Sequence, residues 1–99
     1  TPFGPEVLIF KVGGKMFASL YLDNAEARAN LKCDPERIPE LREEYPAILP
    51  GYHMNKKHWN TLLLAELSDE LINALLEHSY MLVRNSLTAK LRNELDGLE

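Results

Sequence analysis

Apolar residues come in short runs separated by glycines in the first part of the chain, which predicts a β-hairpin. Val7–Val12 is rich in β-branched and aromatic residues, and Lys15–Leu22 is a second such run. The Gly13-Gly14 loop between them favours a tight hairpin, because the primed two-residue turns need positive φ. This loop also predicts the register, in which three pairs of residues face each other: Val12 and Lys15, Phe10 and Phe17, and Leu8 and Ser19.

A third strand is predicted after the turn at Asp23-Asn24. Residues 28–33 alternate between small or apolar and polar side chains, which is the period of a half-buried strand. The inward set is Ala29, Leu31 and Cys33, and the outward set is Arg28, Asn30 and Lys32. One face of the predicted sheet then interleaves cationic, amide and aromatic side chains, as in a nucleic-acid platform: Lys15, Phe17, Tyr21, Arg28, Asn30 and Lys32. The alternative is that Leu8, Phe10, Phe17 and Tyr21 are covered by a further helix or by a partner subunit.

The first helical segment follows this strand. Asp34 and Pro35 suit the N-cap and the first helical position. Pro39 removes a backbone donor beyond the free first turn, so the helix either kinks at Pro39 or effectively begins there. Its predicted end is at Tyr45-Pro46, because a residue that precedes proline disfavours the helical conformation.

A second hairpin and a long helix complete the pattern. Tyr52–Met54 and His58–Leu64 are predicted strands that flank a turn at residues 55–57. Ser68 precedes two acidic residues and an apolar stripe with helical spacing, which predicts a capped long helix. Thr88 predicts the cap of a short terminal helix that ends at Gly97. The predicted stripe of the long helix contains Leu71, Ile72, Leu75, Leu76, Ser79, Tyr80, Leu82, Val83 and Leu87.

The order of these elements, β-β-β-α-β-β-α with a short final helix, predicts an α+β fold. We expect a two-layer domain in which an antiparallel sheet of about five strands is covered by helices on one face. The 99 residues suffice for a single domain, residues 1–99, with a small core. Cys33 is the one cysteine, which excludes an internal disulfide and fits a cytoplasmic protein. No apolar run reaches the length of a membrane span.

The overall charge limits the range of partners. A formal net charge of -4 and a pI of about 5.4 argue against strong non-specific DNA binding. The acidic excess lies in the predicted helices, however, and the predicted strands are slightly basic. Such an asymmetry can orient a protein on an anionic partner despite a negative total charge. Glutamate-rich, solvated helix surfaces are the simpler explanation of the same pattern.

Residues 51–60 form the densest group of chemistry-bearing side chains. They include two histidines, two lysines, two asparagines, a tyrosine and the only tryptophan. Lysines at a turn suit phosphate groups or an acidic protein surface, and they also suit a turn that only needs solubility. We expect Trp59 to fill the core beneath the helices, because tryptophan buries a large area. The alternative is that Trp59 and Tyr52 stack on the bases of a single strand.

Several short motifs, in order along the chain, resemble the MmcQ/YjbR family. The resemblance implies an α-β(3)-α-β(2)-α arrangement, similar to the frataxin-like (CyaY-like) and secretion-chaperone-like folds. It also implies a helix before Pro2 that this sequence does not include, so that part of the sheet is expected to be less covered. The motifs extend from residue 2 to about residue 95: Pro2–Glu6, Phe10–Ala18, Leu31–Glu36, Pro50–Asn60 and Ser79–Val83.

The same resemblance implies a DNA-binding protein in which two hairpins act as a double wing. The hypothesis is a non-enzymatic binding module from a largely uncharacterised family. Its rival is a protein-interaction or chaperone-like module, which binds a protein partner or a second copy through the open sheet face or the long helix. The residues that would contact DNA in the first hypothesis are Lys11, Lys15, Lys32, His53, Asn55, Lys56, Lys57 and His58.

No residue pattern predicts an enzyme, a metal site or a cofactor. A Ser-His-Asp set, a nucleotide-binding loop and a supported pair of carboxylates are all missing from the sequence. Cys33, His53, His58 and His78 are metal-ligating types, but their spacing matches no zinc pattern. Cys33 alternates with Leu31, so we expect a buried and inert thiol. The prediction is therefore no catalytic residue, no metal and no cofactor.

Overall fold

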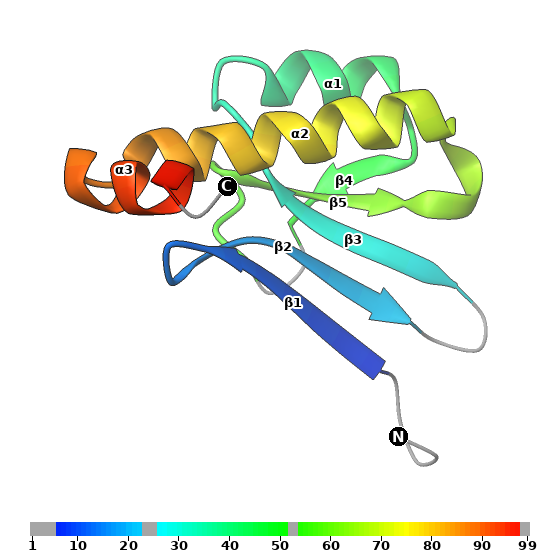
Figure 1. Ribbon diagram of the computed structural model, residues 1–99. Coiled ribbons are helices and arrows are strands. Elements are labelled where there is room, and N and C mark those ends of the chain that lie inside the picture. The colour runs from blue at the N-terminus through cyan, green and yellow to red at the C-terminus, as the bar shows by residue number, and fades with distance from the viewer. Residues whose placement is uncertain (1–5, 23–25, 52–53, 98–99) are drawn as a thin grey trace.

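The computed structural model describes residues 6–22, 26–51 and 54–97. The strands within these residues form one open antiparallel sheet. The order across the sheet is β1-β2-β3-β5-β4, and the α-helices of the described residues lie on one side of it (Figure 1). The predicted two-layer α+β fold is therefore confirmed. The elements are β1 Glu6–Val12, β2 Lys15–Leu22, β3 Ala27–Lys32, α1 Ile38–Glu44, β4 Ile48–Pro50, β5 Trp59–Leu63, the 3₁₀ helix η1 Leu64–Glu66, α2 Asp69–Ser86 and α3 Ala89–Gly97.

The turn of the β1–β2 hairpin is as predicted. Gly13 and Gly14 have φ values of 57° and 81°, the positive values that a primed two-residue turn needs. Val12 pairs with Lys15, as the two-residue loop requires. A side chain at Gly13 would also collide with the helical layer, because its Cβ would lie 2.5 Å from a methyl carbon of Leu87. The turn therefore rests on the end of the helical layer.

The predicted register of the hairpin is wrong beyond the turn. The partner of β1 changes from Met16 to Ala18 without passing through Phe17, so Phe17 is the extra residue of a β-bulge. From Ala18 onward the side chains of β2 therefore share a face with the other set of β1 residues than expected: Tyr21 lies with Val7 and Ile9 instead of Leu8 and Phe10. The observed pairs are Phe10 with Ala18, instead of Phe17, and Leu8 with Leu20, instead of Ser19.

A hydroxyl from α2 explains the bulge. Ser79 Oγ donates a hydrogen bond to the carbonyl of Phe17 (2.5 Å) and accepts one from the backbone N–H of Lys32 (2.9 Å). The β2–β3 ladder ends at the pair of Ala18 and Leu31, and the Ser79 hydroxyl takes the next position between the strands. The Phe17 ring packs edge-on against Tyr80, with ring centroids 5.3 Å apart. This part of α2 therefore holds Phe17 out of the regular ladder.

The register separates the residues of the sheet into two faces. Ala29, Leu31 and Cys33 are buried under the helices, as predicted. They join Ala18, Ile48 and Leu62 in the core, against Leu75 of α2. The residues of the other face, which we call the open face, are Val7, Ile9, Ser19, Tyr21, Arg28, Asn30, Lys32, Leu49, Trp59, Thr61 and Leu63.

The bulge also divides the expected nucleic-acid platform. Tyr21, Arg28, Asn30 and Lys32 lie together on the open face, whereas Phe17 packs under the helices against Tyr80. Lys15 pairs with the buried residue Val12 at the turn. The platform is therefore smaller than the sequence indicated and carries one ring, Tyr21, from the expected set.

The first helix begins later than Asp34 and Pro35 predict. Asp34 does not cap it; its carboxylate accepts a hydrogen bond from the backbone N–H of Glu36 (3.0 Å) in a separate turn. Helix α1 starts at Ile38, and Pro39 lies within its first turn, where the missing N–H costs no helical bond. Of the two alternatives that Pro39 allowed, the later start is the observed one. The helix ends before Tyr45 as predicted.

The strand that precedes the second turn is not the predicted one. The structure has β4 at Ile48–Pro50, paired with β5, and Met54 lies in the connecting loop. Residues 52 and 53 of the predicted strand lie outside the described residues. The apolar Ile48 is fully buried and pairs with Leu62, which outweighs the aromatic pattern that favoured the later segment.

The two C-terminal helices begin at the predicted caps. The Ser68 side chain accepts from the N–H of Leu71 (3.1 Å), and the Thr88 hydroxyl accepts from the N–H of Leu91 (3.2 Å). Leu75, Ser79 and Val83 form the buried line of α2, which confirms the helical period of the stripe. None of the described helices is long and apolar enough to cross a membrane.

Candidate nucleic-acid interface

The topology brings the two hairpins to the same end of the sheet. Because all neighbouring strands are antiparallel, β1 and β3 end where β2 and β5 begin. The β1–β2 turn and the β4–β5 loop therefore lie on either side of the end of β3, and we call this region the hairpin end. The described residues there that were predicted to contact DNA are Lys11, Lys15, Lys32, Asn55, Lys56, Lys57 and His58.

The lysines at the first hairpin and beside it differ in exposure. Lys11 is exposed and directly precedes Val12, the buried last residue of β1. Lys15 follows the turn and is also exposed. Lys32 is half-buried at the end of β3, where its N–H is held by Ser79. The first hairpin thus presents two exposed cations near its turn and a third, less accessible one beside it.

The β4–β5 loop is shaped by its own backbone and by Asn55. The carbonyl of Asn55 accepts from the N–H groups of His58 (3.2 Å) and Trp59 (3.0 Å). Its side-chain oxygen accepts from the N–H of Lys57 (2.9 Å), which is the local bond that favours asparagine in turns. Asn55 therefore organises this loop. It was predicted to contact a ligand, and its side-chain oxygen is instead occupied within the turn.

Arg42 of α1 ties the same loop to the helical layer. Its Nε donates to Asn60 Oδ1 (2.9 Å), and its Nη2 donates to the carbonyls of Lys56 (2.7 Å) and Trp59 (3.1 Å). Asn60 is almost fully buried, with 2% of its surface exposed. One guanidinium therefore fixes both the start of β5 and the tip of the loop, and charged donors make the stronger hydrogen bonds.

The side chains at the loop tip are presented to solvent. Lys56 and Lys57 are exposed, and within the described residues neither ammonium group forms an ion pair. His58 is half-buried, and its carbonyl accepts from the N–H of Cys33 (2.9 Å). His53, the remaining predicted contact, lies outside the described residues. Two adjacent cations on a fixed backbone are thus the main charge of the second hairpin.

Trp59 does not fill the core. It pairs with Lys32 on the open face and is half-buried there, and the buried clusters under the helices do not include it. The prediction that Trp59 packs beneath the helices is therefore wrong. Its position follows from the two-residue period of β5, because Asn60 and Leu62 take the helix side.

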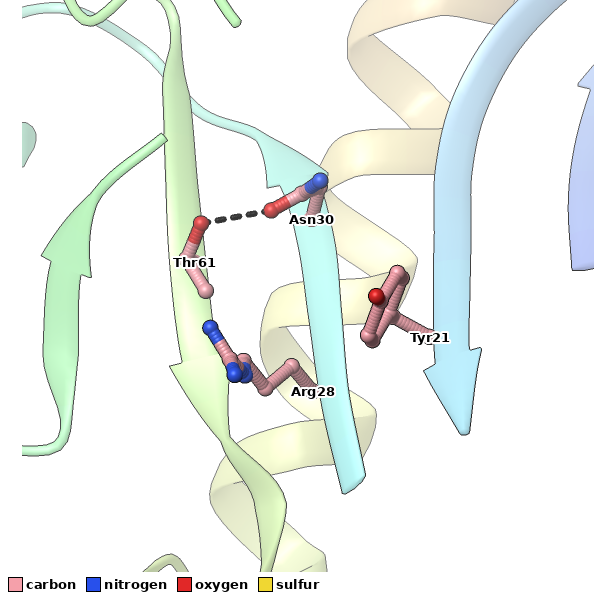
Figure 2. A pocket seen from close by; sticks show the side chains of 4 residues that line it. All are labelled: Tyr21, Arg28, Asn30 and Thr61. Carbon is pink, nitrogen blue, oxygen red and sulfur yellow. Dashed lines mark hydrogen bonds between the residues drawn. The ribbon is translucent and has the colours of Figure 1, made fainter. Parts of the chain in front are cut away.

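A small polar pocket lies on the open face, beyond the hairpin end. Figure 2 shows its walls: Tyr21 from β2, Arg28 and Asn30 from β3, and Thr61 from β5. The pocket holds about 100 Å³. Thr61 Oγ1 donates to Asn30 Oδ1 (2.5 Å), and the Arg28 guanidinium lies 5.7 Å from the centre of the Tyr21 ring. Arg28 also pairs with Glu26, with 2.8 Å between Nε and Oε1, so much of its charge is balanced locally.

Two titratable groups lie under the hairpin end. Burial raises the pKa of the Cys33 thiol, against the opposing effect of Arg37, so the thiol is a poor nucleophile at neutral pH. Burial also lowers the pKa of His78, and Arg37 acts in the same direction. His78 Nε2 accepts from the N–H of Asp34 (3.2 Å), which requires the neutral ring. Among the described residues, no group of three His, Cys, Asp or Glu side chains could hold a metal ion.

Sequence reasoning missed the two side chains that position this region. Ser79 was placed in the apolar stripe of α2, and a hydroxyl at a buried stripe position is a signal that it bonds to a neighbouring strand. Arg42 gave no such signal, because it lies beside Glu43 and Glu44 in a segment that predicts a solvated helix surface. Only the packing of α1 against the β4–β5 loop reveals its role.

Comparison with known proteins identifies the group to which this fold and its motifs belong. The model of the YjbR family matches residues 1–82. The chain belongs to the YjbR family. It is 42% identical over 94 residues to the uncharacterised protein YbdF of Escherichia coli O157:H7, a match that covers 90% of this chain and 74% of YbdF. The resemblance to this family found in the sequence is thus confirmed.

Two solved structures share the fold. The crystal structure of Deinococcus radiodurans protein DR2400, described as a DUF419 domain, matches with a TM-score of 0.85 and 44% identity over 97% of this chain and 75% of that chain. A crystal structure of a Pseudomonas syringae protein matches with a TM-score of 0.71 and 31% identity, over 84% of this chain and 81% of that one. These names carry no activity, so the function has to be argued from the residues.

Proposed function

We propose that this YjbR-family chain is a non-enzymatic DNA-binding module whose two hairpins contact the phosphate backbone. The supporting observation is that the antiparallel topology gathers separate lysines at one end of the sheet. Phosphate contacts supply most of the sequence-independent affinity for DNA, and lysines act in them as mobile point charges. The exposed lysines of the hairpin end are Lys11, Lys15, Lys56 and Lys57.

The spacing of the hairpins suits a duplex. Strands β2 and β5 are both neighbours of β3, so they lie about 10 Å apart. This separation is close to the roughly 12 Å width of the major groove. The Asn55 turn and Arg42 hold the second hairpin in place before binding, which reduces the entropy lost when a complex forms.

The acidic residues of the chain limit the expected affinity. Asp34 and Glu36 follow β3 between the two hairpins, where their carboxylates oppose the lysines. The total charge is also negative. We therefore expect weak binding that falls steeply with salt, because long-range attraction is screened beyond about 8 Å at physiological ionic strength.

Titration of a labelled duplex at several salt concentrations, followed by fluorescence anisotropy, tests the proposal. Lys56→Ala with Lys57→Ala should weaken binding and lower the slope of log affinity against log salt by about 1.8, since each lost phosphate contact removes about 0.9. Both backbone positions remain bonded, because the contacts of Arg42 and Asn55 there are to main-chain atoms.

A control with the same change of net charge separates local contact from overall repulsion. Asn73→Asp with Ala74→Glu alters two exposed positions near the start of α2. These positions are remote from the hairpin end, because the other end of α2 meets the β1–β2 turn (Figure 1). The control should keep the wild-type salt slope. The proposal fails if the wild type does not bind the duplex at low salt, or if the control loses as much affinity as the lysine variant.

A protein-interaction module is the second candidate, and the outer strand β1 favours it. β1 is an edge strand, and Val7 and Ile9 on its open face are 50% and 57% exposed. An apolar edge strand is a template for pairing with another chain. Light scattering during size-exclusion chromatography should then show a dimer that Ile9→Lys converts to a monomer. A wild-type monomer at all concentrations would exclude pairing of two copies.

A further inference from the structure

The small polar pocket on the open face takes no part in the proposed contact with DNA. It holds about 100 Å³, and Figure 2 shows that its walls come from three neighbouring strands, β2, β3 and β5. Arg28 of β3 pairs with Tyr21 of β2, and Asn30 in the next row of the sheet pairs with Thr61 of β5. The pocket is therefore built by the sheet itself, from side chains whose positions the register fixes.

A hydrogen bond decides which polar group Asn30 presents. Thr61 is only 2% exposed, although the described α-helices lie on the other side of the sheet (Figure 1), so its neighbours on the open face bury it. Its hydroxyl donates to Asn30 Oδ1 (2.5 Å). Because Thr61 engages the oxygen of this amide, the group that Asn30 offers to a ligand is Nδ2, which can only donate.

The charge of the pocket favours a carboxylate. Among the described residues that line it, only Arg28 is charged, and its guanidinium lies 5.7 Å from the centre of the Tyr21 ring. A carboxylate of the same chain already contacts it, since Glu26 Oε1 lies 2.8 Å from Arg28 Nε. Arginine binds carboxylates in a fixed planar geometry. One guanidinium that Glu26 partly balances suits a group with a single negative charge better than a phosphate monoester, which carries about two.

The size and surroundings of the pocket indicate that this carboxylate belongs to a larger molecule. A ligand pocket normally holds about 300–1,000 Å³, whereas 100 Å³ is the room of about three water molecules, which suits the end of an acidic side chain. Exposed apolar residues flank the pocket on the same face: Val7 (50%) pairs with Tyr21, and Leu49 (38%) pairs with Thr61. Each lies two strands from β3, a distance of about 10 Å that about three residues of extended chain would span.

We infer that the pocket binds the side-chain carboxylate of an acidic residue in an extended segment of a partner protein. Arg28 and Asn30 Nδ2 hold the carboxylate oxygens, and Glu26 competes with the incoming group for Arg28. Apolar side chains about three residues before and after the acidic residue pack on Val7 and Leu49. The inference rests neither on DNA binding, which uses the hairpin end, nor on pairing of two copies through β1.

Titration with a designed peptide tests the inference. The probe is acetyl-Leu-Ser-Ser-Glu-Ser-Ser-Leu-amide, and the same peptide with glutamine in place of glutamate is the neutral comparison. Amide chemical shifts of this 99-residue chain report both the contact surface and the affinity. The glutamate peptide should shift the residues of the pocket most. The glutamine peptide should bind about tenfold more weakly, because hydrogen bonds to a charged group are the stronger ones.

Asn30→Asp alters the pocket and keeps its frame, because the new carboxylate still accepts from Thr61. It removes the donor Nδ2 and repels the ligand, so the affinity should fall about tenfold. Asn73→Asp is the matched control, since it makes the same change at an exposed position of α2, and it should leave the affinity unchanged. Glu26→Gln should strengthen binding about two- to fivefold, because it removes the competitor for Arg28.

The inference is overturned if the pocket residues do not shift, if the two peptides bind equally, or if Asn30→Asp and Asn73→Asp have equal effects. Dimethyl phosphate, which carries the single charge of a DNA phosphate, should not displace the peptide. Displacement would also overturn the inference, because the pocket would then belong to the DNA surface. Lys56→Ala with Lys57→Ala should bind the peptide as the wild type does, so this inference and the DNA proposal can fail separately.

Discussion

The two hairpins reach the same end of the sheet and are fixed by different means. The β1–β2 turn depends on the conformation of its own glycines, with φ of 57° and 81°. The β4–β5 loop depends on a side chain from another element, Arg42 of α1. The glycine turn should be disturbed mainly by changes to its own residues or to Leu87 at the end of α2, whereas the β4–β5 loop should be disturbed when Arg42 of α1 is removed. This difference decides which residues control the presentation of the lysines.

The strongest test of this comparison concerns Ser79, which joins the first hairpin to β3. Ser79→Ala removes the hydroxyl that bonds both Phe17 and Lys32. Ser79 has 0% of its surface exposed, so a part-buried carbonyl and a part-buried N–H lose their partner beside a buried site. We expect a loss of about 2–4 kcal/mol in the free energy of unfolding, measured in urea. Ser86→Ala, on an exposed part of the same helix, removes only a bond to the Val83 carbonyl of its own turn, and should cost less than about 0.5 kcal/mol. Equal effects would contradict the role of Ser79.

The next test is directed at the glycine turn. Gly13→Ala places a Cβ 2.5 Å from Leu87 and imposes positive φ on a non-glycine residue, so Leu87 or the turn has to move. A loss of about 2–3 kcal/mol is expected. Gly14→Ala has the same backbone conflict but meets nothing within 4 Å, and should cost about 1 kcal/mol. Thermal or urea unfolding of the pair isolates the packing contribution. If Gly14→Ala is less stable than Gly13→Ala, the contact between Gly13 and Leu87 does not limit the turn.

The contrast between the hairpins also explains what could be predicted from the sequence. The Gly-Gly turn, the third strand and the caps at Ser68 and Thr88 were predicted because their signals are local. The register beyond Met16 was not, because the bulge at Phe17 is imposed by a hydroxyl 62 positions away in the chain. The predicted strand at residues 52–54 failed in the same way, since burial of Ile48 against Leu62 selects the pairing.

The candidate site, like the fold, could be predicted from the sequence only in part. The lysines and their hairpins follow from the pattern of turns, and the structure places both hairpins beside the end of β3. The faces of the sheet follow from it only in part, because one extra residue at Phe17 reverses the later part of β2 relative to β1. Trp59 was misplaced because its size was weighed more than its position in the alternating pattern of β5.

Removal of the guanidinium tests the tied loop. Arg42→Ala deletes the donors to Asn60, Lys56 and Trp59, and we expect a loss of about 1–2 kcal/mol, because part of this network is exposed. It should also increase amide exchange at residues 55–58 and weaken DNA binding without altering a loop lysine. Arg37→Ala is the control, since Arg37 is exposed, directly precedes α1 and carries the same charge. If Arg42→Ala and Arg37→Ala bind DNA equally, the hydrogen bonds of Arg42 to the β4–β5 loop do not affect how the loop presents its lysines.

The smallest expected effect is a pH dependence from His78, which lies under the hairpin end. Burial lowers its pKa below the ordinary value of 6.5, so the unfolded chain binds a proton more readily than the folded one. The stability contributed by neutral His78 is then complete above pH 6.5 and is lost as the pH falls toward the lowered pKa. Asp34 opposes this shift and Arg37 adds to it. Urea unfolding of wild type and His78→Gln between pH 5 and 7.5 should give stability curves that agree near neutral pH and diverge as the pH falls, with only the wild type losing this contribution, since glutamine can accept the Asp34 bond but does not titrate. Parallel curves would mean that the bond from Asp34 to His78 does not discriminate between the two protonation states.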